Sequence, residues 1–205
     1  MRAISSTILM LLLSGLLFSK TEADSNSSNL KLTTKIIEQK YCGSGYSDMA
    51  MLKLSLQLTY TNVGQQPLIL YKGSNLIYYV LVGSNEQNLR NKQYEMNMHV
   101  GWITSGIKLN EGSRPSKEFI VLNPNESYQT GGDVSIPIDI DETTQFLKSG
   151  EHVLQVVTET WPSDEAQFDK LKKKWNDTGF LWGKNITSEP MVFSVEKRPH
   201  IVECK

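Results

Sequence analysis

An alternating stretch at residues 52–61 constrains the fold of this chain more than any other feature. Apolar residues occupy every second position of the stretch, namely Leu52, Leu54, Leu56, Leu58 and Tyr60. The residues between them are polar, so an extended segment has one apolar and one polar face, which indicates a half-buried β-strand. Turn-forming residues follow at 62–64, and Pro67 precedes a second apolar run at 68–71. The pattern predicts an antiparallel hairpin that begins a sheet.

Further apolar runs, most of them alternating, predict strands along the rest of the chain. They lie at 30–36, 76–82, 94–102, 119–122, 134–140, 152–158 and 191–195. Pro137 has no amide hydrogen, so its strand is expected at a sheet edge or at a bulge. Short strands separated by turn residues favour an all-β fold, an antiparallel immunoglobulin-like β-sandwich.

One segment, 163–175, has the pattern of a helix. Ser163 is a candidate N-cap, and acidic residues follow it in the first turn. An apolar stripe then recurs at helical spacing, formed by Phe168, Leu171 and Trp175. We therefore expect one short helical insertion within an excursion over 161–188, whereas the polar segment 84–93 is predicted to be a loop.

The first 23 residues resemble a secretory signal peptide. Arg2 precedes an apolar run, and Ala23 ends a sequence typical of a cleavage site. The run is broken before it reaches the roughly 20 apolar residues of a membrane-spanning helix. We expect a signal peptide at 1–23, a single domain over 24–205, and a secreted or periplasmic protein without membrane insertion.

The two cysteines, Cys42 and Cys204, stand near opposite ends of the mature chain. In an exported protein such a pair favours a disulfide over a metal site or a nucleophile. The bond would tie the first segment of the domain to the last. The alternative is two unrelated thiols.

Four phrases of the sequence are similar to bacterial immunoglobulin-like modules. They are TNVGQQPLIL at 61–70, FIVLNPNESY at 119–128, LKSGEHVLQV at 147–156 and SEPMVFSV at 188–195. Together they resemble the BsuPI-type proteinase-inhibitor domain, which implies a sandwich fold and an inhibitory function. His152 stands where that family more usually has tyrosine, and the segments 84–117 and 161–188 have no counterpart.

Charge and motifs exclude several classes of function. The formal net charge is −1 and the basic residues are scattered, so nothing indicates a nucleic-acid partner. The three histidines, His99, His152 and His200, are far apart, and the sequence contains no nucleophile motif or phosphate-binding loop. We expect no catalytic residues, no metal and no cofactor. The polar stripe Glu95, Asn97 and His99 would share one strand face, which is more often simply the solvent side of a sheet.

Aromatic residues gather in the excursion at 161–188. The candidate binding residues are Trp161, Trp175, Phe180 and Trp182. Exposed aromatic rings bind proteins or sugars, whereas an amphipathic helix packs its rings onto a sheet as a lid. The lid is favoured for the stripe that includes Trp175, and both alternatives stay open for Phe180 and Trp182.

Four sequons begin at Asn26, Asn125, Asn176 and Asn185, all in predicted loops. They would accept N-glycans in a eukaryotic secretory pathway.

The expected function is a secreted, non-catalytic module that binds an extracellular protein or glycan. The alternative is an extracellular proteinase inhibitor that presents a rigid loop, for which 106–117 is the candidate, to a protease. An enzyme whose site is assembled by the fold is the third hypothesis. An exposed Trp182 would favour the binding module, and histidines clustered with carboxylates in a cleft would favour the enzyme.

Overall fold

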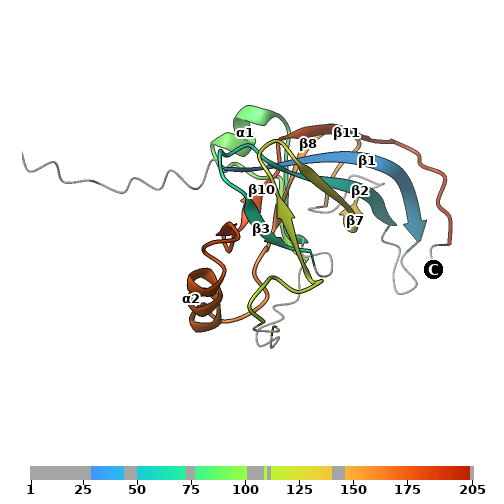
Figure 1. Cartoon of the computed structure of the whole chain (residues 1–205). Helices are drawn as coiled ribbons and strands as arrows, with labels where there is room; N and C mark the ends of the chain where they lie inside the picture. Colours follow the sequence, from blue (N-terminus) through green and yellow to red (C-terminus); the bar gives the residue numbers. More distant parts are fainter. Residues whose placement is uncertain are drawn as a thin grey trace, which may run out of the picture.

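The structure is a computed structural model, and it describes residues 29–43, 50–72, 77–100, 109, 112–139 and 146–203. Eleven strands and two helices lie within these ranges (Figure 1). The strands form three sheets, and nearly all neighbouring strands are antiparallel. The predicted all-β fold with a short helical insertion is confirmed.

The first sheet consists of three long strands, β1 (Leu30–Gly43), β2 (Ala50–Asn62) and β7 (Ser127–Ile138), in the order β1-β2-β7. Buried and partly exposed residues alternate along the whole of β2. The alternation at 52–61 therefore predicted this strand and its buried face correctly. β7 lies at an edge of the sheet as the structure describes it, in agreement with the expectation from Pro137.

The second sheet packs against the first around one hydrophobic core. Its strands are β10 (Ile186–Thr187), β8 (Gly150–Thr158), β4 (Ile77–Gly83) and β5 (Met96–His99), and β11 (Met191–Val195) pairs with another part of β8. Leucines of β2 share the core with Val80 and Val82 of β4 and with Leu154 and Val156 of β8. The two faces form a β-sandwich, and the orders β1-β2-β7 and β11-β8-β4-β5 resemble those of immunoglobulin-like domains.

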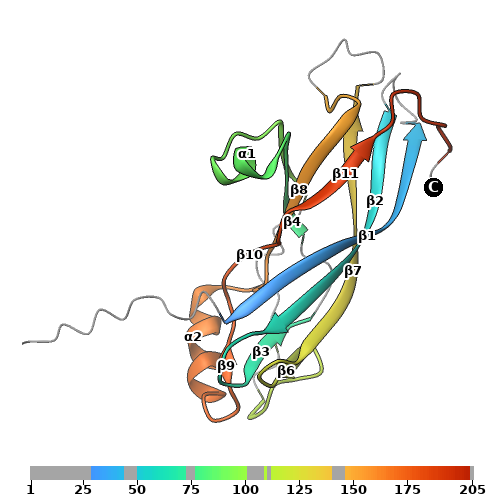
Figure 2. The same cartoon turned by 90° about the horizontal axis from the view of Figure 1, so that it is seen from above.

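A third, small sheet and a helix enclose a second core at one end of the sandwich (Figure 2). The sheet has the order β6-β3-β9, with β6 at Phe119–Leu122, β3 at Leu68–Tyr71 and β9 at Phe180–Leu181. The helix is α2 (Glu165–Lys174). The second core contains Ile69, Leu109, Phe119, Trp161, Leu171, Trp175 and Leu181.

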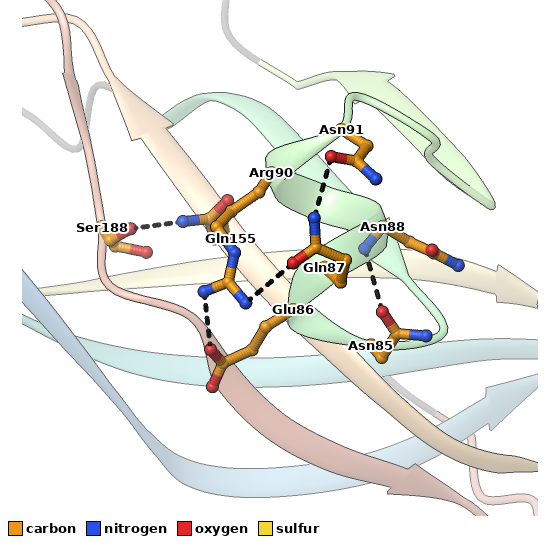
Figure 3. A network of polar contacts seen from close by, with 8 residues as sticks. All are labelled: Asn85, Glu86, Gln87, Asn88, Arg90, Asn91, Gln155 and Ser188. Atoms are coloured by element: carbon orange, nitrogen blue, oxygen red, sulfur yellow. Dashed lines mark hydrogen bonds and ion pairs between the residues drawn. The ribbon is translucent and has the colours of Figure 1, made fainter.

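The helices differ from the prediction at two points. The N-cap of α2 is Asp164 rather than Ser163, because the Asp164 carboxylate accepts a hydrogen bond from the Gln167 amide at 2.7 Å. A short helix, α1 (Glu86–Arg90), lies in the segment predicted to be a loop. Its N-cap is Asn85, whose side chain accepts from the Asn88 amide (Figure 3).

The predicted hairpin between 52–61 and 68–71 is wrong. β2 pairs with β1 and β7, whereas β3 pairs with β6 and β9 in a different sheet. Asn62 explains the separation, because its buried side chain donates hydrogen bonds to the carbonyls of Gln66 and Leu122 at 2.9 and 2.8 Å. These bonds hold the turn against β6, so the chain leaves the first sheet instead of folding back along it.

The two ends of the domain meet at Cys42. This residue is the penultimate residue of β1, and it is disulfide-bonded. A β-bridge places Cys42 beside Val202, two residues before Cys204. Cys204 itself lies outside the described residues, so its pairing with Cys42 stays a prediction from the presence of only two cysteines.

Candidate binding groove

The aromatic residues of the excursion point into the protein instead of forming a surface platform. Trp161, Trp175 and Trp182 retain 9%, 0% and 2% of their exposure. Each indole N–H is satisfied, with acceptors at the carbonyls of Asp164, Gly112 and Lys184 respectively. These three candidate rings are therefore closed to a partner: Trp175 lies in the lid, as favoured from the sequence, and of the two alternatives left open for Trp182 the structure has the buried one.

Phe180 and Trp182 lie between glycines because the packing there is tight. A Cβ atom at Gly183 would overlap the ring of Phe168, and one at Gly179 would overlap the Pro67 carbonyl. Phe180 is the only one of the four candidates that is half-buried, and the Lys172 ammonium lies 5.9 Å from its ring centroid. Close packing, rather than ligand access, explains the two glycines.

The predicted polar stripe at Glu95, Asn97 and His99 does not form one site, because Glu95 and His99 contact different residues. At one end, His152 Nδ1 lies 2.8 Å from Glu95 Oε2, and His152 Nε2 lies 2.9 Å from the Lys148 carbonyl. At the other end, the ring of His99 lies 5.2 Å from that of Tyr79. Burial raises the pKa of Glu159, and nearby His99 partly offsets that effect. No cluster of three or more metal-ligating side chains occurs among the described residues.

A groove of about 650 Å³ lies between the start of β1 and the segment 182–190. Its floor includes the buried residues Leu30, Leu32, Trp182, Ile186 and Ser188. Its rim includes Lys31, Val63, Lys184, Asn185, Thr187 and Glu189. We call this feature the β1/β10 groove, and it includes part of the predicted contact region, with Trp182 in its floor and residues 184–188 along its side.

Hydrogen bonds fix the wall of the groove at Ser188. The Ser188 amide donates to the Val156 carbonyl at 2.8 Å, and the Ser188 hydroxyl accepts from the Val156 amide at 3.1 Å. The Gln155 side chain donates to the Ser188 carbonyl at 3.0 Å (Figure 3). The neighbouring Glu189 amide donates to the Leu32 carbonyl at 3.1 Å, so this wall joins the two sheets.

The opposite end of the same wall is fixed at the Lys184 carbonyl. That oxygen accepts from the Thr160 hydroxyl at 2.6 Å and from the Trp182 indole at 2.7 Å. Two donors on one acceptor hold the turn before β10 in a single position. The groove is therefore preformed, which lowers the entropy that binding would cost.

The β1 side of the groove carries a short piece of strand edge. The Val63 amide donates to the Asn29 carbonyl, so Asn29 faces β2 and the backbone of the next residue, Leu30, faces away from it. Leu32 has the same orientation, and its carbonyl is the one bonded by Glu189. Leu30 thus turns its N–H and C=O away from β2, on the side of the groove, and the residue as a whole is only 4% exposed.

The side chains at the rim are mixed in chemistry. Val63 is 48% exposed, and Lys31 forms an ion pair with Glu189 at 2.8 Å on the surface. An exposed ion pair of this kind contributes little stability and can exchange partners readily. Apolar contact, a strand edge and charges of both signs suit an extended polypeptide better than a sugar ring, since no aromatic face is exposed here.

Three of the four predicted sequons are placed by the structure. Asn125, Asn176 and Asn185 are all exposed, and Asn26 lies outside the described residues. Asn185 stands on the rim of the β1/β10 groove, so a glycan there would border it. Of the candidate inhibitory loop at 106–117, residues 109 and 112–117 are described, and the other five lie outside the described residues.

Sequence reasoning missed the residues that build the groove. Ser188, Gln155 and Leu30 come from three separate segments, and their meeting depends on the pairing of β8 with β10 and on the contact of Glu189 with β1. One signal was available, because Val63 is an apolar residue within a turn.

Among the described residues, no helix is long and apolar enough to cross a membrane.

Comparison with known proteins adds little. No protein-family model and no curated protein matches the chain. Among solved structures it is similar to the X-ray structure of Northeast Structural Genomics Consortium target SoR45, at 13% identity, covering 88% of this chain and 96% of that one. The TM-score is 0.36, at which the likeness carries no argument about fold or function.

Proposed function

We propose that this protein is a non-catalytic binding module that works outside the cell and recognises an extended segment of another protein. The β1/β10 groove is the observation that carries the proposal. It combines a preformed wall, a strand edge at Leu30 and an exposed apolar contact at Val63.

An extracellular location is supported by three features of the chain. Cys42 is disulfide-bonded, and structural disulfides persist in oxidising compartments. Asn125, Asn176 and Asn185 stand exposed in sequons, where a glycosylating enzyme would find them accessible. The signal-peptide pattern at 1–23 points in the same direction.

Binding in the groove would follow the strand-addition mode of peptide recognition. The ligand backbone pairs with the N–H and C=O of Leu30, and one apolar ligand side chain contacts Val63. Lys31 and Glu189 at the rim meet ligand charges and set the preferred sequence. The buried Trp182 supports the floor and does not stack on the ligand.

The test is affinity capture from the extracellular fluid of the source, with the chain lacking residues 1–23 as bait. Val63→Asp places a charge on the apolar rim, and we expect it to weaken binding of the captured protein about tenfold or more. Val192→Asp is the matched control, because Val192 is 57% exposed on β11 and lies outside the groove. Titration calorimetry with each purified variant measures the two affinities.

Equal affinities for the two variants would contradict a site in the β1/β10 groove. If a polysaccharide is captured instead, the ligand is a glycan and not a polypeptide. A captured protease that loses activity in the complex would establish the inhibitor alternative.

A further inference from the structure

The outer edge of β7 presents a row of unpaired backbone groups. The Asn62 amide donates to the Glu126 carbonyl at 3.0 Å, so the even-numbered residues of this segment face β2. The Leu147 amide donates to the Pro137 carbonyl at 3.3 Å, so the odd-numbered residues face away from β2. Five residues therefore turn their N–H and C=O outward along the edge, namely Ser127, Gln129, Gly131, Asp133 and Ser135.

This open edge has a defined beginning and end. A turn at 123–126 precedes it, with Asn125 in a left-handed conformation at φ 69°. Pro137 ends it, because proline has no N–H to offer at its outward-facing position and Leu147 already bonds its carbonyl. No described segment pairs with the stretch 127–135 on this side.

We propose that the edge binds a second copy of this chain, with the two β7 strands antiparallel and Gly131 on the twofold axis. Each Gly131 then faces the partner's Gly131, and Gln129 faces the partner's Asp133. The two three-stranded sheets join into one continuous sheet of six strands. This interface is separate from the β1/β10 groove and does not depend on its ligand.

Charge excludes one alternative register of this pairing. Asp133 carries the only charge on the open edge, and its intramolecular contact with Lys53 is long, at 3.6 Å on the surface. A register centred on residue 133 would place two aspartates directly opposite each other, which is destabilising. The register centred on Gly131 instead places each carboxylate opposite a glutamine amide, which can donate a hydrogen bond to it.

The two ends of the strand agree with the same register. Ser127 meets the partner's Ser135, and the next outward position pairs the turn at Asn125 with the partner's Pro137. Neither Asn125 nor Pro137 can continue a regular ladder of hydrogen bonds, so the pairing ends at this position on both strands. The half-buried Tyr128 lies opposite the partner's Val134 and loses further exposure to water.

Cross-linking tests the register directly. Opposite residues of a hydrogen-bonded antiparallel pair have Cα atoms about 5.5 Å apart, a distance that a disulfide spans. A Cβ at Gly131 would meet only the Leu56 carbonyl at 3.6 Å, an ordinary contact, so the structure accommodates Gly131→Cys. We expect this variant to form a covalent dimer under mild oxidation, visible on a non-reducing gel.

Gln129→Cys is the matched control, since it is exposed on the same strand only two residues away. In the proposed register its two copies are offset by four residues, roughly 13 Å along the strands, and no disulfide can form. Equal cross-linking of both variants would overturn the register, because disulfides form equally at the two positions only when the chains meet by random collision.

Charge substitutions test the interface without a covalent bond. Gln129→Lys faces the partner's Asp133 and should tighten the dimer, whereas Gln129→Asp should weaken it. Each change acts twice across the axis, so we expect the dissociation constant to move about 2- to 30-fold in each direction. Sedimentation velocity over a concentration series measures it.

Val192→Lys and Val192→Asp place the same charges on β11 of the other sheet, away from β7, and they should leave the dissociation constant unchanged. A protein that stays monomeric at hundreds of micromolar overturns the proposal. The β7 edge would then be open to a strand from a different protein.

Discussion

Replacing Trp175 by alanine should cost most of the stability of the second core. The side chain is fully buried, and its ring lies edge-on to Phe119 with centroids 4.9 Å apart. It also donates the indole hydrogen bond to the Gly112 carbonyl at 3.1 Å. Removing a buried tryptophan side chain costs about 3–5 kcal/mol, because the lost transfer energy is joined by the cavity that remains.

That cost is large beside the total stability of a domain, which is about 5–15 kcal/mol. Trp175 and Leu171 are the fully buried residues that attach α2 and its flank to the β6-β3-β9 sheet. Urea unfolding followed by far-ultraviolet circular dichroism measures the change for Trp175→Ala. We expect a lower midpoint with a similar slope if the two cores unfold together.

Two comparisons separate packing from other effects. Trp175→Phe keeps most of the apolar contact and loses the hydrogen bond, so it should cost less than the alanine variant. Lys173→Ala changes an exposed residue on the same helix and should alter the free energy of unfolding by less than about 0.5 kcal/mol. A loss below about 1 kcal/mol for Trp175→Ala would refute the assignment of this ring to the core.

Three further predictions follow from local geometry. Burial raises the pKa of Tyr60 to about 12, so the unfolded chain loses this proton first, near pH 10. The associated stability, about 3 kcal/mol, is complete below pH 10 and lost as the pH rises through 12, and Tyr60→Phe should remove that loss in urea titrations. Gly183→Ala should lower the melting temperature, because its methyl group overlaps the Phe168 ring and overpacking costs about 1–3 kcal/mol. Asp164→Ala removes the cap of α2 and should cost about 1 kcal/mol in urea unfolding; an unchanged midpoint would contradict the bond to Gln167.

Local patterns predicted most strands because a half-buried strand needs only a period of two. β2, β3, β4, β6, β8 and β11 all lie where apolar runs placed them. The helix α2 was found for a similar reason, through an apolar stripe at helical spacing. The short elements α1, β9 and β10 were missed because two to five residues hold too little pattern to identify a period.

Exposure of the aromatic residues could not be predicted from their spacing. Phe180 and Trp182 are only two residues apart, yet Trp182 is buried beside β10 whereas Phe180 is half-exposed, with the Lys172 ammonium over its ring. The difference arises because β9 pairs with β3, a strand more than a hundred residues earlier in the chain. Burial depends on which sheet receives a segment, and sequence spacing does not carry that information.

The sequence by itself determined that this chain is built from strands, which face of β2 is buried, and that Pro137 belongs at an edge. These properties follow from side-chain periodicity and from the missing proline N–H, which act within a few residues. Only the tertiary structure decided that β2 and β3 belong to different sheets and that Leu30 and Ser188 line the same groove. It also decided that no described strand pairs with the outer edge of β7. Those outcomes depend on hydrogen bonds between distant segments, such as Asn62 to Leu122, whose partners are chosen by the whole fold.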